Sequence, residues 1–75
     1  MTYPPERITE VCSLGPVKAS ELLERGRAGD FQAIADWTVR ACYTKMIRAG
    51  VLPLKALADT REIMAVIDLK TVISP

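Results

Sequence analysis

Cys12 and Cys42 carry the only two thiols in the sequence. The chain contains no histidine, which is the commonest general base and a frequent partner of cysteine in zinc sites. The two cysteines lie far apart and form no Cys-x-x-Cys motif. We therefore expect two free thiols in apolar surroundings and no metal site. A disulfide would instead tie the first helix to the central one, which spacing alone does not decide.

The carboxylates and glycines offer little further chemistry. Asp30 is expected to cap a helix, and Asp36 is expected to pair with Arg40 at i, i+4 spacing. Neither carboxylate has a second one placed beside it for acid–base work. Gly26 and Gly29 are not followed by the Gly-Lys-Ser/Thr that completes a phosphate-binding loop. The sequence therefore predicts no catalytic residue, no cofactor and no enzymatic activity.

A run of positive charge is the one electrostatic signal. From Arg40 to Lys55, every charged side chain is basic. Cations near the end of a helix also complement its dipole, so part of this bias serves the fold. Exposed cations beside a turn can equally contact an acidic protein surface or phosphates. Tyr43 is expected at a rim or interface of the same region. The candidate partner-binding residues are Arg40, Tyr43, Lys45, Arg48 and Lys55.

The periodicity of apolar residues predicts an all-α fold that positions these side chains. The expected helices run from Glu6 to Leu14, Val17 to Arg25, Phe31 to Ala49 and Pro53 to Ala58, with another from Asp59 onward. The first of these helices is expected to end at Gly15 and Pro16, the second at Gly26 and the third at Gly50. The apolar phase changes near Asp59, which predicts a kink there. Leu54, Leu57 and Ala58 are expected to face inward.

The helix from Phe31 to Ala49 is the longest and is expected to be central, with the other four or so packed around it in a compact bundle. Its narrow polar stripe is expected to face solvent, and Trp37 is expected in the core. The stripe comprises Gln32, Asp36, Arg40, Thr44 and Arg48. Residues 1–5, with Tyr3, are expected to form a flexible N-terminal arm. Residues 66–73 fit either a helix end or a short strand that pairs with another chain.

Composition bounds the function further. Seventy-five residues allow one small domain, and 49% of them are hydrophobic, which favours an apolar surface that meets a partner or a second copy. Ten basic and nine acidic side chains leave a net charge of +1, so the chain is no polyelectrolyte. No export signal or membrane-spanning apolar run is apparent, so we expect a cytoplasmic protein with no membrane contact.

These features favour a non-enzymatic regulator or adaptor that binds a larger protein, with the transcription machinery as one target. The first alternative is a DNA-binding regulator with a helix-turn-helix-like arrangement around Gly50, so nucleic acid stays open as a partner. The second is a structural subunit of a homo-oligomeric assembly. Affinity, salt dependence and oligomeric state separate the three.

Overall fold

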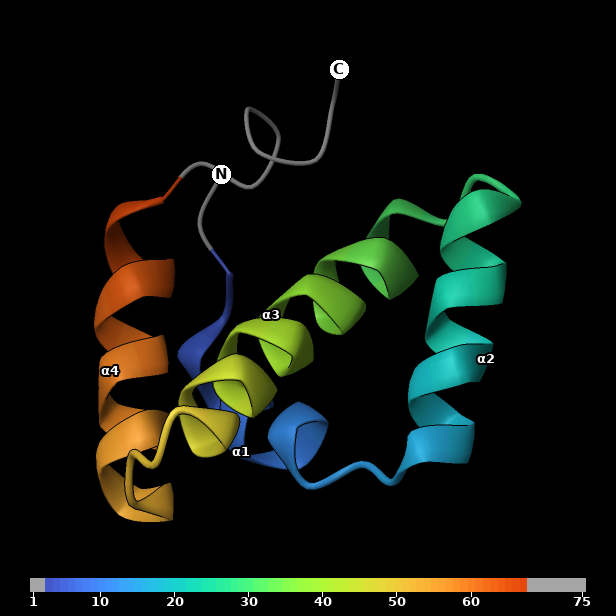
Figure 1. The fold of residues 1–75 in the computed structure, drawn as a ribbon. Coiled ribbons are helices and arrows are strands. Elements are labelled where there is room, and N and C mark those ends of the chain that lie inside the picture. The colour runs from blue at the N-terminus through green and yellow to red at the C-terminus, as the bar shows by residue number, and fades with distance from the viewer. Residues whose placement is uncertain (1–2, 68–75) are drawn as a thin grey trace.

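The computed structural model describes residues 3–67, and over that range all the regular secondary structure is helical, with no strand. This confirms the predicted all-α class. The helices are α1 (Pro5–Cys12), α2 (Pro16–Arg27), α3 (Phe31–Arg48) and α4 (Pro53–Val66) (Figure 1). The sequence leaves open whether residues 66–73 form the end of a helix or a short strand. The part of this segment beyond Ile67 lies outside the described residues.

The helix ends follow from local chemistry. α1, α2 and α4 each begin with a proline, whose missing N–H would have no partner in a first turn. α3 begins after Asp30, whose carboxylate accepts the Ala33 N–H at 3.2 Å, as predicted for a cap. The Arg25 guanidinium donates to the same carboxylate at 2.9 Å and lowers the pKa of Asp30. α3 stops before Gly50, whose φ of +93° is a left-handed conformation that glycine adopts without strain.

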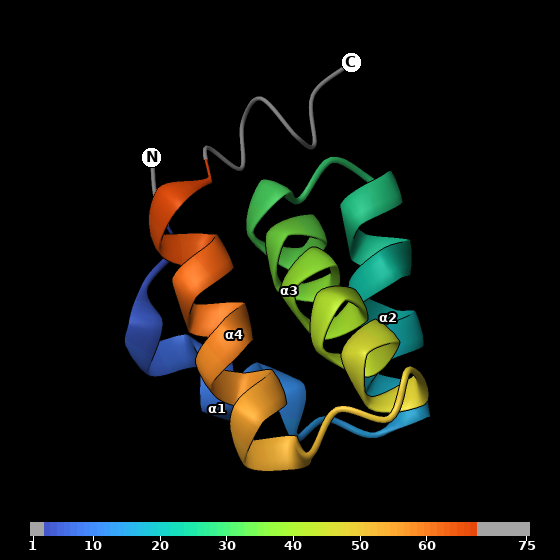
Figure 2. The same ribbon diagram turned by 60° about the vertical axis from the view of Figure 1, so that its left-hand side comes forward.

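α3 packs against each of the other three helices, and α1 also packs against α4 (Figures 1 and 2). The core between α1, α3 and α4 contains Ile8, Val11, Val39 and Met64. Tyr3 belongs to the same core and is only 3% exposed. The expectation that Tyr3 lies in a flexible arm is therefore wrong.

α4 is one continuous helix from Pro53 to Val66, so the predicted division into two helices near Asp59 is wrong. Thr60 is fully buried because its hydroxyl donates to the Ala56 carbonyl at 2.7 Å and needs no water. Ala56, Thr60 and Met64, at four-residue spacing, form the inner face of α4. Leu54, which we expected inside, is 84% exposed. Ala58, also expected inside, is exposed as well.

α2 continues past Gly26 to Arg27, which corrects the prediction that Gly26 ends this helix. The glycine serves packing instead. A Cβ atom at position 26 would lie 2.8 Å from the Cβ of Ile34 on α3, closer than real Cβ atoms come. Gly26 therefore lets α2 approach the first turn of α3.

Gly26→Ala is expected to lower the free energy of unfolding by about 1–3 kcal/mol, the usual cost of overpacking. In an unobstructed helix the same change would raise stability by roughly 0.5–1 kcal/mol. The comparison is Gly15→Ala at the N-cap of α2, where no atom lies within 4 Å of a Cβ, so a loss there reflects capping and not overpacking. Urea titrations of both variants test this, and a stabilised Gly26→Ala protein would contradict the close approach.

Candidate functional site

A groove of about 360 Å³ lies on the face of α3 opposite the core. Trp37, Ala41, Thr44 and Arg48 follow one another at spacings of four, three and four, which places them along one side of the helix. We call this feature the α3 groove. Its lining residues are Trp37, Arg40, Ala41, Thr44, Lys45 and Arg48.

The α3 groove exists because α2 is shorter than α3. α2 has 12 residues and α3 has 18, which correspond to about 18 and 27 Å at 1.5 Å per residue. The Nε of Arg40 donates to the carbonyl of Leu14 at 2.9 Å, immediately before α2 begins. The start of α2 is therefore level with Arg40, and the last two turns or so of α3 extend beyond it. Figure 1 shows the two helices joined at residues 28–30 and separating toward the Arg48 end.

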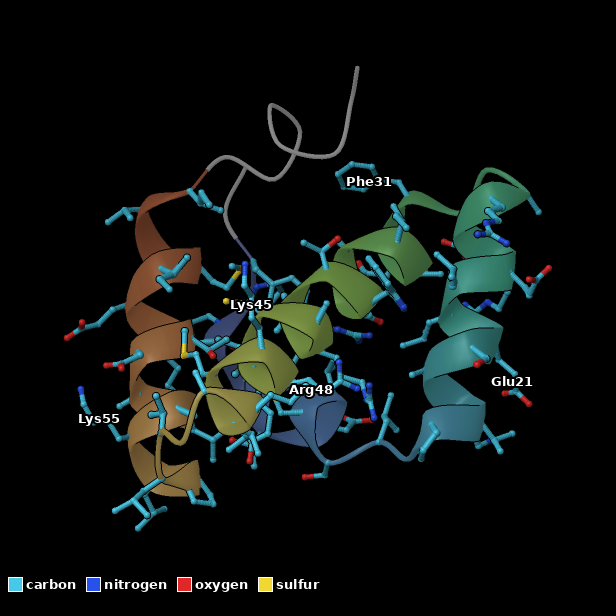
Figure 3. All side chains as sticks on the ribbon, in the orientation of Figure 1. Glu21, Phe31, Lys45, Arg48 and Lys55 are labelled. Atoms are coloured by element: carbon cyan, nitrogen blue, oxygen red, sulfur yellow. The ribbon has the colours of Figure 1, made fainter. Side chains whose placement is uncertain are left out.

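The charge of the groove is uniformly positive. Arg40, Lys45 and Arg48 line it, and no acidic side chain does. Within residues 3–67, none of these three cations forms a salt bridge. Lys45 and Arg48 are exposed, and Figure 3 labels both on the C-terminal half of α3. Lys45 and Arg48 are therefore available to an anionic partner, whereas Arg40 is also held by its hydrogen bond to the Leu14 carbonyl.

The structure brings together three of the five predicted site residues. Tyr43 is half-buried and does not line the groove. Lys55 lies on α4, where its Nζ is 3.2 Å from the carboxylate of Asp59. Just past the end of α3, Leu52 is 75% exposed, so an apolar turn adjoins the basic surface.

Trp37, Ala41 and Thr44 line the groove but were not among the predicted site residues, and Trp37 is the largest of them. We expected it in the core, but it is half-buried and lines the groove. The sequence does contain a sign of this position. The residues on the same side of the helix as Trp37 are small or polar: Ala41, Thr44 and Arg48. A tryptophan among cations combines apolar area with a polar N–H, as interface residues often do.

A second polar cluster lies on the other side of α3 and ties it to the N-terminal segment. Asp36 is 5% exposed and accepts hydrogen bonds from the Tyr3 hydroxyl, from Arg7 Nη2 at 2.6 Å and from Gln32 Nε2 at 3.0 Å. We call these four residues the Asp36 cluster. The predicted Asp36–Arg40 pair is wrong, because Arg40 instead donates to Leu14. The polar stripe of α3 therefore partly faces the protein.

The electrostatics of the Asp36 cluster favour a fixed structural charge pair. The hydrogen bond to Asp36 raises the pKa of Arg7, which keeps the guanidinium charged. Burial, and then the hydrogen bond to Asp36, raise the pKa of Tyr3, which keeps the phenol neutral. The arrangement holds the segment before α1 against α3 and leaves no buried side-chain polar atom of the described range without a partner.

Both cysteines are free thiols and half-buried, as predicted for the thiol state. Burial raises the pKa of Cys12 to about 11 and also raises that of Cys42. A thiol that stays protonated at neutral pH is a weak nucleophile.

Over the described range, His, Cys, Asp and Glu side chains do not gather in threes that could hold a metal ion. None of α1 to α4 is both long and apolar enough to cross a bilayer. No family model, curated protein or solved structure matches the chain.

Proposed function

We propose that this chain is a small, cytoplasmic, non-enzymatic regulator or adaptor that binds an acidic surface of a larger protein through the α3 groove. The observation that carries the proposal is the set of three cations around Trp37 with no salt-bridge partner in residues 3–67. Charge complementarity of this kind speeds association and selects partners. A target in the transcription machinery is one case of this proposal.

The surroundings of the groove favour protein over DNA. A helix-turn-helix around Gly50 would use the start of α4 to contact base edges. That start presents exposed Leu54, and Lys55 is paired with Asp59. Farther along, Arg61 donates to the Thr9 hydroxyl at 2.8 Å. An apolar turn beside a few cations suits a protein interface, whose centre is apolar and whose rim is polar.

The test is charge reversal at the groove. Lys45→Glu combined with Arg48→Glu is expected to weaken binding to the natural partner by about 100-fold, because each reversed charge replaces an attraction by a repulsion. The partner is first isolated from a lysate of the native host with the wild-type chain. Its affinity is then measured by titration at two salt concentrations. The variant should also lose most of the salt dependence.

The matched control is Lys18→Glu combined with Arg27→Glu. It changes the net charge equally, and both side chains are 69% exposed on α2. If this control weakens binding as much as the groove variant, overall charge and not the groove controls recognition. Tight, salt-dependent binding of a double-stranded DNA fragment would favour the DNA-binding alternative. Wild-type dimers in sedimentation that the groove variant abolishes would favour the oligomeric one.

A further inference from the structure

We infer that the occupant of the α3 groove is an acidic amphipathic α-helix of the partner, lying along the turns of α3 that α2 does not reach. The inference rests on the proposed function and adds the secondary structure and chemistry of the bound element. It follows from the shape of the groove, the placement of its charges and the poor fit of the other occupants.

The floor of the groove is suited to a helix. Ala41 and Thr44 form its middle, between Trp37 and Arg48. Helices pack with their axes roughly 8–10 Å apart, and small residues at the contact allow the closer distances. From Arg40 to Arg48, the part that α2 does not reach, the face extends about 12 Å at 1.5 Å per residue, enough for about two turns of a partner helix, with Trp37 at its edge. α2 already packs on the earlier part of α3, so the new helix would continue that layer.

The cations border this floor on both sides. Successive helical residues are rotated by about 100°, so Arg40 lies about 60° to one side of Trp37 and Lys45 about 80° to the other. Arg48 lies near the middle line, at the far end. A ligand that matches this pattern has an apolar stripe for Trp37 and Ala41, with carboxylates on both flanks. An acidic amphipathic helix has that arrangement, and helices commonly bind in grooves.

Other occupants fit less well. An extended peptide gains affinity by adding to a sheet edge, and residues 3–67 contain no strand. Single-stranded nucleic acid uses a series of aromatic platforms, whereas Trp37 is the only aromatic lining residue. A second copy could offer α2, where Val17 is exposed. However, Glu21, labelled on α2 in Figure 3, lies 3.8 Å from Lys18, and Glu24 lies 3.5 Å from Arg27, so that face is not acidic.

The probe is a synthetic 14-residue helical peptide with a leucine–alanine stripe flanked on both sides by glutamates. Trp37 is the only tryptophan in the chain, so its fluorescence reports occupancy of the groove directly. We expect a saturable shift of the Trp37 emission with a dissociation constant on the order of 100 µM, typical of a small, weak interface. Replacing the glutamates by glutamines, or two central residues by prolines, should each weaken binding at least about tenfold.

A variant of the floor separates shape from charge. Ala41→Gln adds bulk without charge and should weaken the probe about tenfold by holding the helix away. Ala58→Gln, at an exposed position of α4, is the matched control and should bind normally. Thermal unfolding of both variants shows whether the fold is retained. If Ala41→Gln unfolds, Thr44→Gln serves the same purpose.

The outcomes distinguish this inference from the proposed function. Equal affinity of the proline-containing and helical peptides would overturn the helix and leave an acidic protein partner. A second outcome leads to the same conclusion: no peptide shifts the Trp37 emission, although the groove variant still loses the natural partner. A tighter shift with a poly-dT oligonucleotide would overturn both. Self-association of the wild type that the helical probe cannot displace would assign the groove to a second copy.

Discussion

Asp36→Ala is expected to lower the free energy of unfolding by about 2–4 kcal/mol, a large share of the roughly 5–15 kcal/mol that holds a small domain together. The carboxylate is 5% exposed and accepts from three side chains. Its removal leaves the hydroxyl of buried Tyr3 without an acceptor and Arg7 without its counter-ion. The side chain of Arg7 is 40% exposed, so water solvates part of the released charge and limits the loss. Urea unfolding followed by circular dichroism measures the change.

The control is Asp59→Ala. Asp59 also sits inside a helix and pairs with a cation, but its partner Lys55 is 69% exposed. Exposed pairs of this kind contribute about 0–1 kcal/mol. Equal losses in the two variants would show that the burial of Asp36 has no special effect. The loss of unfolding free energy for Asp36→Asn should fall between those of the two alanine variants. The amide oxygen can still accept from Tyr3, but the attraction to Arg7 is lost.

The helix boundaries that chemistry fixes locally could be predicted from the sequence. Asp30 and Gly50 bracket α3 within one residue of the expected range, because a cap and a left-handed glycine act on the adjacent backbone. Pro16 likewise marks the start of α2. Errors arose where a polar residue is buried. Asp36 is assigned to the solvent face because periodicity directs polar side chains outward unless a partner is known, and the same rule leaves Thr60 out of the apolar phase of its helix. Their partners, a carbonyl on the same helix and side chains elsewhere in the chain, are visible only in three dimensions.

The candidate site was predictable in charge and not in shape. The basic run indicated Arg40, Lys45 and Arg48 correctly as neighbours, because residues three to five apart on one helix share a side. The groove itself depends on where α2 begins relative to α3, which is a tertiary property. The same property exposes Trp37, whose apolar character favoured the core when the helix was considered alone. Lys55 was grouped with the run by sequence proximity, but the turn places it on α4, where it pairs with Asp59.

Tyr3→Ala is expected to lower the free energy of unfolding by about 3–5 kcal/mol, the usual cost of truncating a buried aromatic side chain. Tyr3 is 3% exposed and packs in the core with Ile8, Val39 and Met64. Its hydroxyl donates to Asp36, so the variant loses both apolar burial and a charge-assisted hydrogen bond. Chemical denaturation of the full chain measures the loss. A change below about 0.5 kcal/mol, the level of ordinary surface substitutions, would show that the segment before α1 is not part of the fold.

Two further variants divide the effect of Tyr3 into its parts. Tyr3→Phe keeps the ring and removes the hydroxyl, so it should cost only about 1.5–3 kcal/mol, the scale of one hydrogen bond to a charged group. Combined with Asp36→Ala, it should cost less than the sum of the two single changes, because both remove the same hydrogen bond. Tyr43→Ala is the comparison for aromatic size, since Tyr43 is only half-buried. A larger loss for Tyr43→Ala than for Tyr3→Ala would place the principal aromatic packing on α3 and not at the N-terminal segment.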